Sequence, residues 1–219
     1  MIKLKIIKNY HDDKNNLFSY SSLKLEPGLT TLVGCNGSGK TTLIKIIESY
    51  CRKNNIAFIC FDNYEEGGRE AMGKLASQEL INDLSLDMIS SEGERIQNNI
   101  GRFAYTIGTK IKKLIPGDKV VIVFDAIDSG FSIDGVVELK DLIDLVLEDN
   151  KDKEVYILAS ANGYELANNE RCLDVTSGKY LRFENYNDYK RFILKTRNKK
   201  NERYELKSRI DIDKEMGDS

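Results

Sequence analysis

The sequence has few of the residues on which several kinds of functional site depend. Its 219 residues contain one histidine, His11, so a histidine-based catalytic triad or a histidine-rich metal site is not expected. The cysteines, Cys35, Cys51, Cys60 and Cys172, show no CxxC spacing, and we expect reduced thiols in a cytoplasmic protein. No apolar run approaches the roughly 20 residues that span a bilayer, so membrane insertion is not expected.

The chain also lacks a strong excess of either charge. Its formal net charge is -2, which argues against a polyelectrolyte binder, and its length suits one domain with a substantial core.

We place this domain at residues 1–195, followed by a charged tail at 196–219. A helix is expected to start near Asn187 and to end in a disordered segment, with nucleic-acid or partner contact as the alternative. Helical spacing indicates that three aromatic residues anchor this helix to the core: Tyr186, Tyr189 and Phe192.

Apolar runs alternate along the chain with segments of helical periodicity. The runs predict strands at 2–7, 23–25, 29–33, 56–61, 119–124 and 154–159. Apolar residues at helical spacing predict helices at 40–53, 74–86, 94–114 and 135–149. Residues 171–183 are typical of a hairpin that turns at Ser177-Gly178. Strands alternating with helices indicate an α/β fold with a mainly parallel sheet.

A glycine-rich segment between the third strand and the first helix carries the strongest functional signal. Residues 34–41 match GxxxxGK[ST] completely. In this pattern, backbone N–H groups point at phosphate oxygens, and the helix N-terminus adds partial positive charge. Lys40 is expected to reach the β- and γ-phosphates, and the Thr41 hydroxyl to ligate Mg²⁺. The predicted nucleotide-binding residues are Gly34, Asn36, Gly37, Ser38, Gly39, Lys40, Thr41 and Thr42.

A second acidic motif ends the strand at 119–124. Asp125 follows this apolar run, as does the aspartate that holds Mg²⁺ in phosphate-loop enzymes. We therefore predict a metal site at Thr41 and Asp125, with Lys40 and Asp125 as catalytic residues. The next position normally polarises the attacking water, but here it is Ala126, which cannot accept a proton. The chain is expected to bind Mg-ATP and to hydrolyse it poorly.

Three motifs in this order, GCNGSGKTTL, SSEGER and VVIVFDAIDSG, resemble those of an ABC-class ATPase. The most similar branch contains the soluble SMC-type and RecF-like ATPases, and the resemblance covers about residues 1–183. It implies a P-loop NTPase fold of the ABC type, with a mainly parallel sheet and an antiparallel N-terminal β part. A small helical lobe at about 62–115 would be inserted, which is too short for a coiled-coil arm.

The resemblance also implies a dimer. The SSEGER segment aligns with the family signature, which binds the γ-phosphate held by the opposite subunit, although Ser90 and Glu92 depart from its pattern. Two ATP molecules would thus lie between two copies of the chain. The signature residues that would act in trans are Ser91, Gly93 and Glu94, and the D-loop residues at the same interface are Asp128 and Ser129.

The same alignment puts Ala126 at the position of the catalytic glutamate. Two origins fit: a substitution that traps the ATP-bound dimer, or a naturally degenerate ATPase. The family's switch histidine is absent, and Ser160 and Asn162 are candidates for its role. Asn63 is the candidate at the Q-loop position. Phe18 or Tyr20 could stack on adenine, although core packing is the alternative for both.

Three functions follow from these motifs. The first is an ATPase that dimerises on ATP and drives a separate effector or nuclease in DNA repair, DNA processing or antiphage defence, with nucleic acid as an additional candidate ligand. The second is the nucleotide-binding cassette of a transporter, which the SEGER signature and the missing switch histidine disfavour. The third is a non-hydrolysing, nucleotide-gated structural module, which Ala126 favours if it is native.

Overall fold

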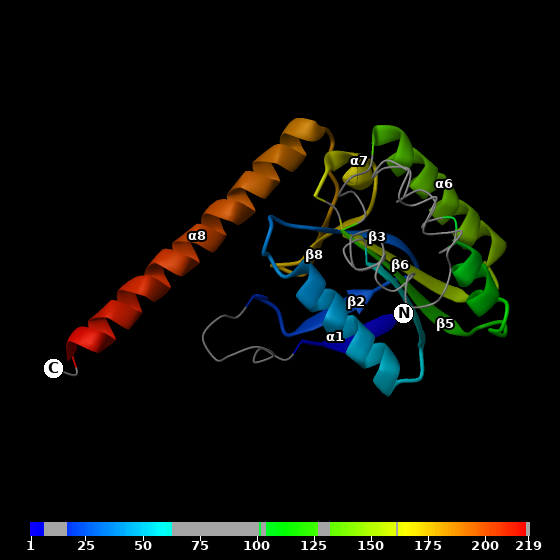
Figure 1. The fold of residues 1–219 in the computed structure, drawn as a ribbon, viewed down its shortest axis with the longest axis horizontal. Coiled ribbons are helices and arrows are strands. Elements are labelled where there is room, and N and C mark those ends of the chain that lie inside the picture. The colour runs from blue at the N-terminus through cyan, green and yellow to red at the C-terminus, as the bar shows by residue number, and fades with distance from the viewer. Residues whose placement is uncertain (7–16, 63–100, 102–103, 127–131, 161, 218–219) are drawn as a thin grey trace, which may run out of the picture.

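The computed structural model describes residues 1–6, 17–62, 101, 104–126, 132–160 and 162–217, with side chains up to residue 202. The fold is mixed α/β (Figure 1). A six-stranded sheet has the order β4-β5-β6-β3-β7-β8, and a separate two-stranded sheet pairs β1 with β2. The strands are β1 Ile2–Lys5, β2 Ser22–Leu25, β3 Gly28–Val33, β4 Ala57–Asp62, β5 Lys119–Asp125, β6 Glu154–Ser160, β7 Cys172–Asp174 and β8 Lys179–Leu181.

The large sheet is mainly parallel, as the alternation of strands and helices predicts. Strands β4, β5, β6, β3 and β7 pair in parallel, and only β8 runs antiparallel, to β7. The β1–β2 pair is antiparallel, which confirms the expected N-terminal β part. The β7–β8 hairpin also forms where expected, with Gly178 at φ 70° in its turn.

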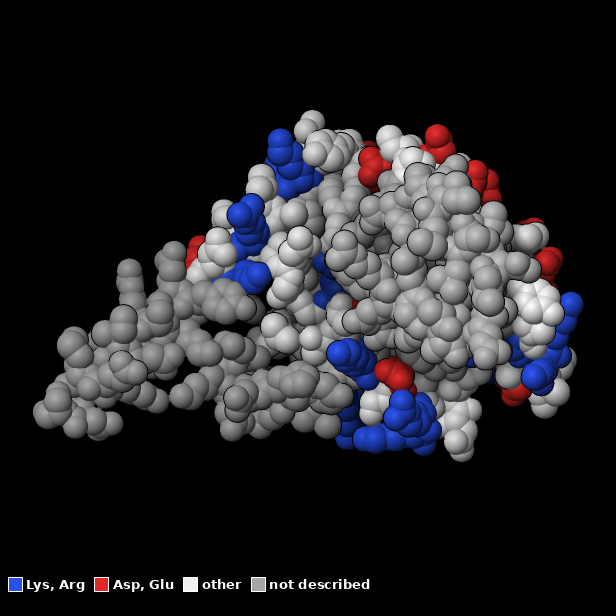
Figure 2. All heavy atoms as spheres, viewed as in Figure 1, with Lys and Arg blue, Asp and Glu red and all other residues white. Residues whose placement is uncertain are grey.

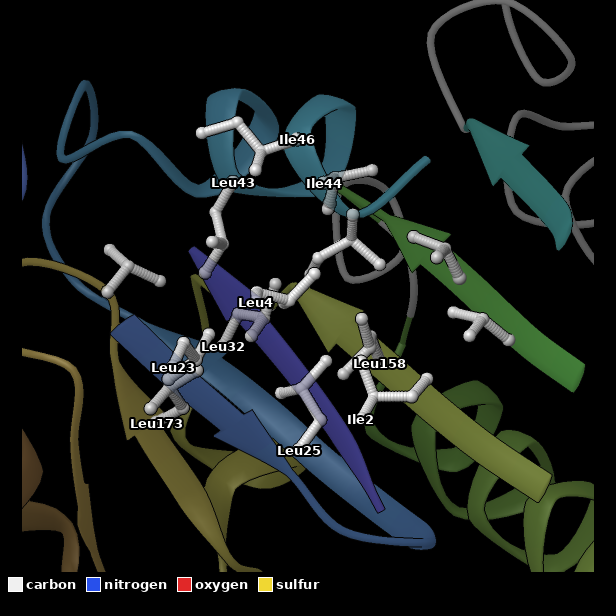
Figure 3. Packing of buried hydrophobic residues seen from close by; sticks show 14 of the residues in the cluster. Ile2, Leu4, Leu23, Leu25, Leu32, Leu43, Ile44, Ile46, Leu158 and Leu173 are labelled. Atoms are coloured by element: carbon white, nitrogen blue, oxygen red, sulfur yellow. The ribbon is translucent and has the colours of Figure 1, made fainter. Parts of the chain in front are cut away.

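The sheet is covered on both faces because its central strands alternate buried side chains between two cores. On β5, Val121 and Val123 join the core under helix α1, whereas Val120 and Ile122 join the core on the other face. Helix α1 (Lys40–Lys53) packs on the first face together with the β1–β2 pair (Figure 3). Helix α6 (Ile133–Asp149), helix α7 (Tyr164–Ala167) and the helical segment 104–111 contribute to the second core.

Helix α1 forms at the bounds that its periodicity predicts. Leu43, Ile47 and Cys51 lie four residues apart and are fully buried, so they form one apolar stripe against the sheet. Arg52 and Lys53 lie in its last turn, where positive charge is favourable. Figure 3 shows Leu43 extending from α1 towards Leu32 of β3, so the core reaches the strand that precedes the glycine-rich segment.

Helix α8 (Tyr186–Gly217) is the longest element and extends away from the sheet (Figure 1). Its base is held by aromatic packing: Tyr189 is buried, and its ring centroid lies 5.1 Å from that of Phe183. Phe192 is half-buried in the same cluster, whereas Tyr186 is 56% exposed. Two of the three predicted anchors therefore pack against the core.

Other differences from the expected elements are small. Helix α7 is absent from the prediction because four residues are too few to show a helical period. The expected helix at 74–86 and most of the lobe at 62–115 lie outside the described residues, as do residues 94–100 and 102–103 of the expected helix at 94–114, whereas residues 104–111 of that helix are described and helical. The proposed boundary at 195–196 falls inside α8 and coincides with no break in secondary structure. Among the helices that the structure describes, none is both long and apolar enough to cross a bilayer.

Candidate functional site

The carboxyl ends of three adjacent strands bring the predicted site residues together. Strand β6 lies between β5 and β3 in the sheet. The glycine-rich segment leaves β3, Asp125 ends β5, and Ser160 ends β6. Ligands in parallel α/β sheets bind at this edge, because loops and helix N-termini gather there. Residues from three distant parts of the sequence thus form one site.

The glycine-rich segment, residues 34–39 (the phosphate loop), curls tightly between β3 and α1. Gly34 has φ 154°, and a Cβ at this position would lie 2.5 Å from the Ser38 Oγ. The Ser38 N–H donates to the Cys35 carbonyl oxygen at 3.0 Å, which closes the turn. A side chain at position 34 would therefore collide with the loop itself, and only glycine allows this curl.

The loop ends at the N-terminus of α1, where Lys40 and Thr41 begin the helix. No acidic residue of this 14-residue helix lies in its first turn, although the Asp125 carboxylate of β5 contacts it there through Thr41. The Lys40 Nζ folds back and donates to the Gly34 carbonyl oxygen at 2.9 Å. The lysine therefore spans the two ends of the loop.

Ser38 carries an unsatisfied polar atom within this loop. Its side chain is buried, and its Oγ has no hydrogen-bond partner among the residues that the structure describes. A buried hydroxyl without a partner costs about 1–3 kcal/mol. An oxygen-rich ligand in the loop would offer this hydroxyl an acceptor.

Asp125 links the loop region to the sheet. The Thr41 Oγ1 donates to the Asp125 Oδ2 at 2.9 Å, across a sequence separation of 84 residues. The Ser160 Oγ donates to the Asp125 Oδ1 at 2.5 Å. Each carboxylate oxygen therefore has its own hydroxyl donor, which fixes the orientation of the side chain. The sequence predicted Thr41 and Asp125 as partners, and the structure brings them into contact.

Ala126 lies directly beside this carboxylate in an uncommon backbone conformation. Its φ is 52°, in the left-handed region that residues other than glycine rarely adopt. The Ala126 N–H donates to the Ser160 Oγ at 2.7 Å. The buried Ser160 hydroxyl thus bridges Asp125 and the backbone of residue 126. Of the predicted switch candidates, Ser160 belongs to this cluster.

The other switch and interface candidates are placed differently. Asn162 is exposed, and its backbone carbonyl accepts a hydrogen bond from the Tyr189 hydroxyl at 2.9 Å, at the base of α8. The remaining candidates lie outside the described residues: Asn63, Ser91, Gly93, Glu94, Asp128 and Ser129.

Phe18 and Tyr20, the two candidates for adenine stacking, both take part in packing. Phe18 is buried, and a Cβ at Gly39 would lie 3.2 Å from its ring. The Tyr20 hydroxyl donates to the Val175 carbonyl oxygen at 3.1 Å, and burial raises the pKa of this tyrosine well above its usual value. Phe18 thus supports the end of the phosphate loop from within the core.

Sequence analysis missed one side of the loop, which α8 covers. The Cys35 N–H donates to the Thr196 Oγ1 at 3.3 Å, and Thr196 is buried. One helical turn further along, the Lys200 Nζ donates to the Asn36 carbonyl oxygen at 2.8 Å. The i, i+4 spacing of Thr196 and Lys200 is the only sequence signal for this contact, and it does not name the surface that they meet.

Comparisons with known proteins add little to this geometry. No protein-family model matches the chain, and no curated protein matches it. Among solved structures, the crystal structure of Stu0660 of Streptococcus thermophilus matches with a TM-score of 0.48 and 10% sequence identity. The match covers 76% of this chain and 74% of that chain. At this level of similarity, it carries no argument about function.

Proposed function

We propose that this chain is an ATP-binding protein of the ABC ATPase class that holds Mg-ATP at the phosphate loop. The observation that carries the proposal is the contact between Thr41, next to the loop, and Asp125, at the end of a neighbouring strand. It joins the two motifs that a phosphate-loop nucleotide site requires. The unsatisfied Ser38 hydroxyl supports an oxygen-rich ligand at the same place, and the N-terminus of α1 contributes its partial positive charge.

The described residues fit Mg²⁺ together with the nucleotide. Mg²⁺ prefers oxygen ligands and is commonly held by one or two carboxylates together with substrate phosphates. Thr41 Oγ1 and Asp125 Oδ2 are a hydroxyl and a carboxylate oxygen already 2.9 Å apart. Residues 41 and 125 would thus hold the ion, whose chemistry is to neutralise phosphate charge. Ser160 would keep Asp125 in place through the other carboxylate oxygen.

Lys40 and the loop amides would bind the phosphates themselves. The Lys40 Nζ now donates to the Gly34 carbonyl oxygen, and a phosphate oxygen would be a stronger, charged acceptor for the same donor. Glycines in the loop let the backbone approach the ligand without obstruction from side chains. Binding would therefore exchange an internal hydrogen bond for a charge-assisted one.

Hydrolysis by this chain would be slow, because residue 126 supplies no general base. The Ala126 side chain has no atom that can accept a proton, and its backbone N–H is already committed to Ser160. A positioned base typically contributes about 10²–10⁴-fold to a rate. We therefore propose that the chain is a hydrolysis-deficient ATPase. From the resemblance of its motifs, we also propose that it forms an ATP-sandwiched homodimer. This dimer would regulate or drive a separate partner in DNA repair, DNA processing or antiphage defence.

Ala126 also favours a second candidate function, a nucleotide-gated module that works without hydrolysis. Steady-state ATP hydrolysis by this chain, by Ala126→Glu and by Ala126→Glu combined with Asp125→Asn separates the two. If glutamate raises turnover and the added Asp125→Asn removes it, the site is that of an ATPase. If the unaltered chain and Ala126→Glu both bind Mg-ATP and neither hydrolyses it, either the separate partner is required for turnover or the chain is a nucleotide-gated module. Absence of Mg-ATP binding would refute both.

The proposed dimer has its own test at the signature segment. Ser91→Arg would place a bulky cation where the segment is expected to meet the partner's γ-phosphate. ATP-dependent dimerisation, measured by light scattering after gel filtration, is expected to disappear while Mg-ATP binding to the monomer is kept. An unaffected dimer would refute the alignment of the signature.

A further inference from the structure

Helix α8 lies against the outer side of the phosphate loop and contacts it at two consecutive backbone positions. Thr196 accepts a hydrogen bond from the Cys35 N–H, and Lys200 donates one to the Asn36 carbonyl oxygen. The Thr196 hydroxyl is itself oriented, because it donates to the Ile193 carbonyl oxygen at 2.8 Å. Both contacts join segments more than 160 residues apart, since their sequence separations are 161 and 164.

Lys200 lies close to the backbone of the loop at Gly37, whose positive φ favours glycine. Gly37 has φ 73°, and a Cβ at this position would lie 2.7 Å from the Lys200 Nζ. The ammonium group therefore occupies the space that a side chain at position 37 would take. The Lys200 side chain is flexible, so the positive φ of the loop is the stronger requirement for glycine at this position.

The contact with Lys200 also fixes the direction of one backbone N–H group. No described peptide bond is cis, and in a trans peptide the C=O and N–H groups point in opposite directions. The Asn36 carbonyl points at Lys200 on α8, so the Gly37 N–H points away from α8. Rotation of this peptide would break a hydrogen bond to a charged donor. Lys200 thus holds the Gly37 N–H in one orientation before any ligand arrives.

We propose that α8 is a part of the phosphate-binding site: Thr196 and Lys200 hold the loop in its anion-binding conformation, and Lys200 is a positioning residue for the nucleotide phosphates. The proposal rests on the proposed function, since it concerns how the same loop binds Mg-ATP. A preorganised loop binds more tightly, because less ordering has to occur on binding. The added positive charge beside the loop acts in the same direction.

The arrangement couples the loop to the rest of α8. Lysine and arginine side chains are exposed at separate places along the described part of the helix (Figure 2). The backbone of the helix continues beyond Lys200 and away from the sheet (Figure 1). Because coupling between two sites is reciprocal, nucleotide binding should strengthen the docking of α8, and displacement of α8 should weaken nucleotide binding.

The test is isothermal titration of Mg-ATP into the full chain and four variants: Lys200→Met, Lys200→Arg, Lys199→Met and Lys40→Ala. Lys200→Met removes the charged donor, Lys200→Arg retains one, and Lys199→Met removes an exposed lysine from the adjacent position. We expect Lys200→Met to weaken binding about tenfold, as for the loss of a charge-assisted hydrogen bond that orders a site. Lys200→Arg should recover most of the affinity, and Lys199→Met should match the unaltered chain.

Lys40→Ala separates failure of this inference from failure of the proposed function. If the unaltered chain does not bind Mg-ATP, the proposed function falls, and this inference falls with it. If Lys40→Ala abolishes binding but Lys200→Met binds like Lys199→Met, only the role of α8 is overturned. A purely structural role would lower the melting temperature of ligand-free Lys200→Met and leave its affinity unchanged.

Hydrogen exchange gives a second measurement of the coupling. Amides of residues 196–202 are expected to exchange more slowly when Mg-ATP is added to the unaltered chain, and this protection should be smaller in Lys200→Met. A conservative pair at Thr196 extends the test, because Thr196→Ser keeps the acceptor for the Cys35 N–H and Thr196→Val removes it. Equal protection in all of these chains, with and without Mg-ATP, would contradict the coupling.

Discussion

The Thr41 hydroxyl and the Asp125 carboxylate lie 2.9 Å apart, although 84 residues separate them in the sequence. Their contact depends on the parallel sheet, because β3 and β5 end at the same edge on either side of β6. The Ser160 hydroxyl at the end of β6 holds the second oxygen of the carboxylate. The sheet order thus brings a helix start, an acid and a hydroxyl to one place.

Asp125→Asn tests the role of this carboxylate in holding the metal with the nucleotide. The amide can still accept hydrogen bonds from Thr41 or Ser160, but it lacks the charge that favours Mg²⁺. A ligand at 100 times its dissociation constant stabilises a protein by about 2.7 kcal/mol. We expect the rise in melting temperature with Mg-ATP to be large in the unaltered chain and small in the variant.

The exposed Asp141, on helix α6, provides the control for this substitution. Asp141→Asn removes the same charge from the molecule without touching the site, so its Mg-ATP response should be unchanged. Equal Mg-ATP responses in Asp125→Asn and Asp141→Asn would refute the metal site.

Ser160→Ala tests whether the buried hydroxyl supports the neighbouring backbone. Its removal leaves the Ala126 N–H without its acceptor and one oxygen of Asp125 without its donor. Each unsatisfied buried group costs about 1–3 kcal/mol, so the free energy of unfolding should fall by at least about 1 kcal/mol. Urea denaturation gives this value directly.

Ser19→Ala is the matched control, because the Ser19 hydroxyl also donates a hydrogen bond, to the Thr176 carbonyl oxygen, but on the exposed surface. Its free energy of unfolding should change by less than about 0.5 kcal/mol. A loss in Ser160→Ala no larger than that in Ser19→Ala would mean that the hydroxyl bridge is not a structural element of the site.

Glu154 predicts a specific dependence of stability on pH. A hydrogen bond from the N-terminal ammonium group, and then one from the Tyr156 hydroxyl, lower the pKa of Glu154 to about 2. Because the folded-state pKa lies below the ordinary value of 4.5, the charged carboxylate stabilises the fold above that value. This contribution is lost progressively as the pH falls from about 5 towards 2.

The corresponding experiment compares urea midpoints of the unaltered chain and Glu154→Gln from pH 7 to pH 3. The variant should be less stable at pH 7, and the difference should shrink as the pH falls. Glu148→Gln removes a carboxylate whose side chain is 70% exposed and should show a smaller, flatter difference. A difference for Glu154→Gln that grows towards low pH would contradict the assigned cause.

The sequence predicted those parts of the fold that depend on local periodicity. Leu43, Ile44, Ile46 and Ile47 at helical spacing predicted α1 with its observed bounds, and the apolar run before Asp125 predicted β5. Helix α7 could not be predicted, since four residues contain barely one turn. The sequence pattern also extended the first strand to residue 7, whereas β1 ends at Lys5.

The site was predictable where a motif fixes its geometry and not where tertiary packing does. The loop motif predicted Lys40 and Thr41 as site residues, and the acidic residue after an apolar strand predicted Asp125. Ser160 was predicted only as a switch candidate. Its position between β3 and β5 depends on the order of strands in the sheet, which no local sequence pattern predicts. Lys200 was missed, because a lysine among other basic residues carries no sign of what it contacts.

The central claim, that the phosphate loop binds Mg-ATP, is tested most directly by titrating Mg-ATP into the unaltered chain, Lys40→Ala and Lys45→Ala. Lys45 lies exposed on the same helix and serves as the control. We expect the unaltered chain and Lys45→Ala to bind equally, and Lys40→Ala to bind at least about a hundredfold more weakly. No binding by the unaltered chain, or equal affinity in Lys40→Ala, would contradict the assignment.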